Sequence, residues 1–381
     1  LTHILHNIVP TLDQLAPTGD HARDSTAALF DYHREYILEL MTLFPDTRMA
    51  AIAKNLLAQS SVPEMANQFM YFADFLYNPP VMANHSLNEL ATSYWGSGTG
   101  QFLIRSGWET DATFANFICG PYTESHAHRD QGSFVIFKGT WLAYDANIQS
   151  HSGIEQDEEM HNLVRIEQNG STIRQVEGAP RCNMLALADN DLFSYALAEI
   201  TPIYNGNPAV NKVEREFLLI KPNTFVIFDR VVTSGTGIQR IWTLNTPGTP
   251  TINGDTMHYL DSGHQLDMYR LAPIGLSTEI FTGTVVGEDV AGKRLETADS
   301  NGSQSLFLHV LTTDGALTSQ SRSDASGQTG AQLSLQDGRT VLVHFSNSGH
   351  GGNLEVRAAN GELQTSTALP TTVTMPPLFK E

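Results

Sequence analysis

The stretch REFLLIKPNTFVIFDR, residues 215–230, places two β-forming runs close together, at 216–220 and 224–228. Both runs are rich in branched and aromatic residues, which favour strands. Similar short runs occur at 134–137 and 340–345. Dipeptides with Asn or Asp before Gly, which favour hairpin turns, occur at 169–170, 205–206, 253–254, 301–302, 314–315, 337–338 and 360–361. This pattern predicts a large antiparallel β-sandwich.

The first 88 residues have a different pattern. Three runs, 24–41, 47–57 and 64–76, carry apolar residues at mixed three- and four-residue spacing, and prolines separate them. We therefore predict an α+β protein with a short helical segment over 1–88 and an antiparallel β-sandwich over 89–381. The Ser/Thr/Gly-rich stretch 318–330 is a loop or long hairpin and a candidate sub-boundary.

The net charge of −19, from 41 acidic and 22 basic residues, argues against nucleic acid, since no Lys/Arg cluster is present. No apolar run approaches the roughly 18 residues of a membrane span. Cys119 and Cys182 are too few for a disulfide framework, and the sequence leaves their pairing open. The acidic run 155–159 is expected to be a solvated loop. The first residues lack an initiator Met and a signal pattern, so we expect a longer parent chain.

The segment GPYTESHAHRDQGSF, residues 120–134, contains two histidines one residue apart. In an extended strand, His126 and His128 would face the same side, where both could bind a metal, or one could bind it while the other faces a cleft. Asp145 follows an expected hairpin return, and His161 precedes another expected strand. Two imidazoles and a carboxylate suit Zn²⁺ or a similar divalent ion. The alternative is a solvated or hydrogen-bonded pair of histidines.

HAHRDQGSF (126–134), LAYD (142–145) and HN (161–162) together resemble the H-x-H-x-D-x-x-x-F, L-x-x-D and H-N pattern of heparinase II/III-type polysaccharide lyases. The stretches 100–108 and 215–230 are also similar, so the resemblance covers about residues 90–245 well. It implies that His128, Asp145 and His161 are metal ligands, most readily for zinc, and that His126 is catalytic. It also implies that residues 1–88 are the closing helices of an α/α toroid.

The resemblance further implies β-elimination in a uronic-acid-containing polysaccharide of the alginate or glycosaminoglycan class, in the periplasm or outside the cell. In the family the catalytic tyrosine comes from the toroid, and nothing in the context of Tyr32 or Tyr36 identifies either as that residue. Among other candidates for substrate binding, Arg105 could clamp a carboxylate, whereas Tyr122 and Trp95 could stack on sugars. A structural ion pair and core packing are the respective alternatives.

Two other interpretations stay open. One is a non-catalytic carbohydrate-binding sandwich fragment. Besides an acidic polysaccharide, the candidate partners of the chain under the lyase interpretation are an N-terminal toroid fragment or a second copy of the chain. The other is a cupin-type metalloenzyme, because Gly120, the H-x-H pair and Gly139 resemble the first cupin motif. That motif also requires a Glu shortly after the second His, where this chain has Asp130 and then Gln, Gly and Ser.

Overall fold

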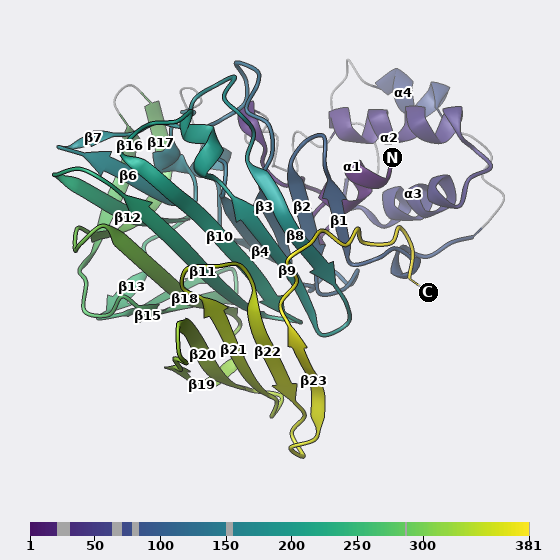
Figure 1. The fold of residues 1–381 in the computed structure, drawn as a ribbon. Coiled ribbons are helices and arrows are strands. Elements are labelled where there is room, and N and C mark those ends of the chain that lie inside the picture. Colours follow the sequence, from purple (N-terminus) through teal and green to yellow (C-terminus); the bar gives the residue numbers. More distant parts are fainter. Residues whose placement is uncertain (21–30, 63–70, 78–83, 150–154, 286–287, 381) are drawn as a thin grey trace.

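The computed structural model describes residues 1–20, 31–62, 71–77, 84–149, 155–285 and 288–380. Its α-helices all precede the strands: α1 (Thr2–Asn7), α2 (Asp31–Leu43), α3 (Arg48–Gln59) and α4 (Tyr71–Leu76). Figure 1 shows them beside one edge of the sheets, near both chain ends. This order confirms the predicted α+β class. The predicted helix starts at 24–26 and 64 lie outside the described residues.

Four antiparallel sheets follow the helices. The first has the order β1 (Ser93–Gly96), β2 (Gln101–Arg105), β3 (Phe114–Ile118), β4 (Phe134–Lys138) and β5 (Thr140–Ala143). The second has the order β16 (Thr278–Val285), β17 (Glu288–Asp299), β12 (Ile238–Thr246), β6 (Val164–Gln168) and β7 (Ser171–Thr172).

The third and largest sheet has the order β13 (Thr251–Asn253), β14 (Thr256–Asp261), β15 (His264–Ala272), β18 (Gln304–Thr313), β11 (Thr224–Thr233), β10 (Val210–Ile220), β9 (Phe193–Glu199) and β8 (Asn183–Asp189). The fourth has the order β19 (Leu317–Arg322), β20 (Gln328–Leu335), β21 (Thr340–Ser346), β22 (Gly352–Arg357) and β23 (Leu363–Ala368). The stretch 318–330 thus forms part of the β19–β20 hairpin, and a domain boundary there stays a prediction.

The central strands of the largest sheet, β9, β10, β11 and β18, are buried on both faces. Along β10, Phe217 and Leu219 pack into a core shared with the first two sheets, whereas Leu218 and Ile220 pack into a core shared with the fourth sheet. Side chains alternate between the faces of a strand, so a sheet covered on both sides needs apolar residues at every position. This explains the continuous apolar runs in residues 215–230. No helix in the described ranges is long and apolar enough to cross a membrane.

Cys119 and Cys182 form a disulfide, with their Cα atoms 5.1 Å apart. The bond closes a loop of 63 residues in sequence separation. That loop contains His126 and the three candidate metal ligands, His128, Asp145 and His161. Closing a loop of this length in the unfolded chain stabilises the fold by about 4 kcal/mol on the chain-entropy scale.

Candidate functional site

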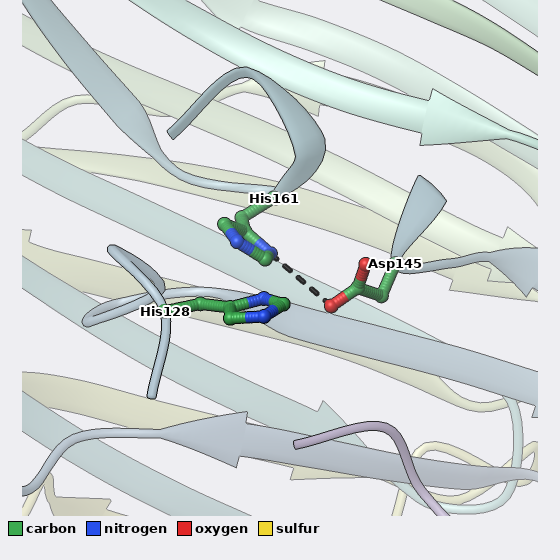
Figure 2. A group of neighbouring side chains, drawn as sticks. All are labelled: His128, Asp145 and His161. Carbon is green, nitrogen blue, oxygen red and sulfur yellow. Dashed lines mark ion pairs between the residues drawn. The ribbon is translucent and has the colours of Figure 1, made fainter. Parts of the chain in front are cut away.

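The side chains of His128, Asp145 and His161 converge inside the protein, as Figure 2 shows. Each offers a ligand atom, and these atoms lie within 4.8 Å of one another. Asp145 Oδ2 is 3.2 Å from His161 Nδ1, and all three residues are buried. The buried His128 Nδ1 and His161 Nε2 have no hydrogen-bond partner among the described residues. Buried nitrogens without partners, next to a carboxylate, fit a divalent cation.

Short turns on either side of the strands orient two of these ligands. Asp145 follows β5, and both the backbone N–H and the Nδ2 of Asn147 donate to its Oδ1 at 2.9 Å. This leaves Asp145 Oδ2 to face His161. The 3₁₀ turn η6 (Glu158–Met160) leads directly into His161.

The expectation of a solvated acidic loop at 155–159 is wrong for its last two residues. Glu158 and Glu159 are buried. Arg174 Nη1 lies 2.6 Å from a carboxylate oxygen of each, and Arg165 Nη1 lies 2.9 Å from Glu159. These ion pairs anchor the turn that precedes His161.

Asn162 joins the segments that carry the ligands. Its Nδ2 donates to the carbonyl oxygens of Phe134 at 2.7 Å and Tyr144 at 3.2 Å. Its Oδ1 accepts from the backbone N–H of Asn245 on β12 at 2.6 Å. The Asn of the H-N pair is therefore a structural link between β4, the end of β5 and β12, a role that the sequence motif alone does not reveal.

Arg215 on β10 contacts the backbone of two segments that carry the candidate ligands. Its Nε and Nη2 donate to the two carboxylate oxygens of Asp229 at 2.6 and 3.1 Å. Its Nη1 donates to the carbonyl oxygens of Gly132, at 2.7 Å, and Asn162, at 2.8 Å. One buried guanidinium thus holds the H-x-H loop and the H-N segment in place.

The charges of Asp145 and His161 stabilise each other. Burial alone would raise the pKa of the Asp145 carboxyl, but the charge and hydrogen bond of His161 outweigh it and lower that pKa. Burial alone would lower the pKa of His161, but the charge and hydrogen bond of Asp145 outweigh it and raise that pKa. Burial, with the charge of His161, lowers the pKa of His128, which favours the neutral imidazole that binds metals. Burial raises the pKa of the neighbouring Asp130.

The H-x-H pair does not lie on a strand, which corrects the prediction. Residues 119–133 connect β3 to β4 through turns, because Gly120-Pro121 and the later turn residues interrupt an extended ladder. The two rings therefore do not share a sheet face: the His126 side chain is 72% exposed, and that of His128 is fully buried. Both rings nevertheless contact Asp20, a residue that no motif in the sequence marks.

His126 borders a cavity of about 460 Å³, within the usual size range of ligand sites. The cavity lies between the N-terminal segment and the H-x-H loop, and Tyr36 of α2, Asn7 of α1 and Gln101 of β2 also line it. Tyr36 is 51% exposed. The sequence around Tyr36 carries no signal of this cavity, because His126, which also lines it, is 90 residues away in the chain.

The structure does not bring the three predicted substrate-binding residues to this cavity. Arg105 is 1% exposed, and its Nη2 donates to the carbonyl oxygens of His6 and Ile8 at 2.8 and 2.7 Å. Trp95 and Tyr122 are buried in the core between the sheets. The expected carboxylate clamp and stacking platforms are therefore corrected to structural roles.

The chain is similar in sequence and in structure to known heparin- and heparan-sulfate lyases. A heparin-sulfate lyase of Pedobacter heparinus is 28% identical over 167 residues, which are 41% of this chain and 24% of that protein. The crystal structure of heparan sulfate lyase HepC from Pedobacter heparinus matches with a TM-score of 0.64 at 18% identity, over 91% of this chain and 52% of that one. A heparinase III structure matches with a TM-score of 0.65 at 12% identity, over 91% and 53%. No family model matches the chain.

The fold is thus that of heparinase III-type structures, and the predicted resemblance to heparinase II/III-type proteins is confirmed. The chain spans about half the length of these solved structures.

Proposed function

We propose that this chain carries the metal centre and one catalytic face of a polysaccharide lyase that cleaves a uronic-acid-containing glycan by β-elimination. One observation carries the proposal. An exposed histidine borders a ligand-sized cavity, and two residues further along the chain a buried histidine joins a His–Asp–His group. The likeness to heparin-sulfate lyase supports the substrate class.

In β-elimination a base removes the proton at C5 of the uronate, and an acid protonates the leaving oxygen at C4. We assign the base to His126 Nε2, because the hydrogen bond between His126 Nδ1 and Asp20 occupies the other ring nitrogen. Tyr36 is the candidate acid, since its exposed side chain lines the same cavity. A divalent cation, most readily zinc, held by His128, Asp145 and His161 would fix the loop that presents His126.

We also propose that residues 1–88 form the end of an α/α toroid and residues 89–381 a heparinase II/III-type sandwich, and that the protein acts in the periplasm or outside the cell. These proposals follow from the resemblance. The disulfide is consistent with an oxidising compartment.

Turnover is tested by incubating the chain with alginate, hyaluronan and heparan sulfate and following the absorbance of the unsaturated uronate product. We expect product from at least one of the three polymers. Binding of a polymer without product would instead support the non-catalytic carbohydrate-binding interpretation.

Replacing Asp145 by Ala is expected to weaken zinc binding by more than about 100-fold, because a ligand contributes more than the 10–100-fold of an outer-shell group. Competition with a chromophoric chelator measures the affinity. Asp130→Asn is the matched control: it changes a neighbouring buried carboxylate and should retain zinc. The reverse result, with loss in Asp130→Asn alone, would favour the cupin-type ligand set.

Replacing Tyr36 by Phe is expected to lower kcat by about 10²–10⁴-fold with little change in KM, because only the proton donor is removed. Tyr32→Phe is the companion variant. Tyr32 lies one helical turn away in sequence, and its side chain is outside the described part of the chain. Full activity in Tyr36→Phe would remove Tyr36 from the mechanism.

A further inference from the structure

Asp20 approaches the H-x-H loop through its backbone. Its N–H donates to the carbonyl oxygen of His126 at 2.9 Å. The preceding residue, Gly19, has a φ of +55°, and a Cβ there would lie 2.4 Å from that same oxygen. Glycine is therefore needed at position 19 for Asp20 to come so close.

The Asp20 carboxylate contacts both histidines. Its Oδ2 lies 2.5 Å from His126 Nδ1, and its Oδ1 lies 2.9 Å from His128 Nε2. Gln156 Nε2 donates to Asp20 Oδ1 at 3.1 Å and to the carbonyl oxygen of Ser125 at 2.8 Å, which holds the carboxylate against the loop. The carboxylate is three-quarters buried, so these contacts are partly shielded from water.

An ionised carboxylate only accepts hydrogen bonds, so each ring nitrogen that faces it must carry a hydrogen. In a neutral imidazole the other nitrogen then keeps its lone pair. For His126 that other nitrogen is Nε2. For His128 it is Nδ1, which is buried without a hydrogen-bond partner among the described residues.

We propose that Asp20 is a positioning residue that sets the tautomers of both histidines at once. It orients His126 so that Nε2 can accept a proton, and it orients His128 so that Nδ1 can bind the metal. The roles of base and metal ligand in this inference rest on the proposed function. The contacts of Asp20 with the two histidines do not depend on whether the chain is catalytically active. A carboxylate on the distal nitrogen of a metal-binding histidine is a common way of orienting that ligand.

The test uses the whole chain with ¹⁵N-labelled histidine. Long-range ¹H–¹⁵N spectra at alkaline pH, where the rings are neutral, should show His126 as the Nδ1–H form and His128 as the Nε2–H form. In Asp20→Asn the single amide oxygen cannot accept from both rings, and the amide nitrogen donates instead. One of the two histidines should therefore change tautomer, and zinc affinity should fall by about 10–100-fold. Asp13→Asn, whose carboxylate bonds Thr11 in the same segment, should change neither.

The outcomes separate this inference from the proposed function. If the wild-type chain binds zinc and Asp20→Asn keeps both tautomers and the affinity, the inference is overturned while the metal centre stands. If the wild-type chain binds no zinc, the metal centre fails, and the wild-type tautomers alone still decide the role of Asp20. A zinc-bound structure with Asp20 coordinated directly to the ion would also overturn the assignment. If Asp20→Asn does not fold, the wild-type spectrum remains the test.

Discussion

Replacing His126 by Ala is expected to lower the rate of product formation by about 10²–10⁴-fold, the usual contribution of a general base. The folded state and the zinc content should not change. The ring is largely exposed and belongs to no hydrophobic cluster, so its loss leaves no cavity in the core. It is also absent from the His–Asp–His group. Initial rates of unsaturated product, together with thermal melting and zinc analysis, measure the three quantities.

The matched control for this variant is His258→Ala. His258 is also an exposed histidine that contacts a carboxylate, with its Nδ1 2.7 Å from Asp267, but it lies on β14 of the largest sheet and does not line the cavity. Its removal should leave the rate unchanged. Activity above a tenth of wild type in His126→Ala would exclude His126 as the base.

Replacing Arg215 by Met is expected to reduce the free energy of unfolding by about 3–5 kcal/mol, the usual cost of breaking a buried ion pair from one side. The variant leaves the buried Asp229 carboxylate without its bidentate partner, although Trp242 Nε1 still donates to it at 3.1 Å. It also leaves the carbonyl oxygens of Gly132 and Asn162 without the guanidinium donor. Urea unfolding followed by circular dichroism measures the difference.

Arg357→Met serves as the control for Arg215. Arg357 pairs with Glu355 at 2.6 Å, but both side chains are more than a third exposed, and such pairs contribute only about 0–1 kcal/mol. A second comparison is the double variant Arg215→Met/Asp229→Leu, which removes both charges and should recover part of the lost stability. If Arg215→Met reduces the free energy of unfolding no more than Arg357→Met does, Arg215 does not have the proposed supporting role.

The sheets and the ligand group could be predicted because their signals are local. Turn dipeptides such as 169–170 and 314–315 adopt positive φ at both residues, as the hairpin pattern requires. The motifs around His128, Asp145 and His161 are short and sit next to recognisable strands. The group of His128, Asp145 and His161 could therefore be named from the resemblance of these motifs, although its geometry could not, and its role as a ligand set stays a prediction.

The remainder of the site depends on contacts between distant parts of the chain. Asp20 reaches His126 across 106 residues, and no periodicity marks either residue. An arginine suits a carboxylate, which places Arg105 at the substrate in the sequence-based prediction, but its guanidinium instead donates to carbonyl groups at the C-terminal end of α1. Whether a long polar side chain is buried is a property of tertiary packing, which residue type and spacing do not specify.

The bond between Cys119 and Cys182 also has a consequence for assembly of the centre. His128, Asp145 and His161 all belong to one covalent macrocycle, so they remain tethered near one another even when the sheets have melted. Tethering raises the effective concentration at which each ligand meets the others. In the proposed metal centre, a chain whose disulfide has already formed would therefore have the shorter conformational search for the three ligands.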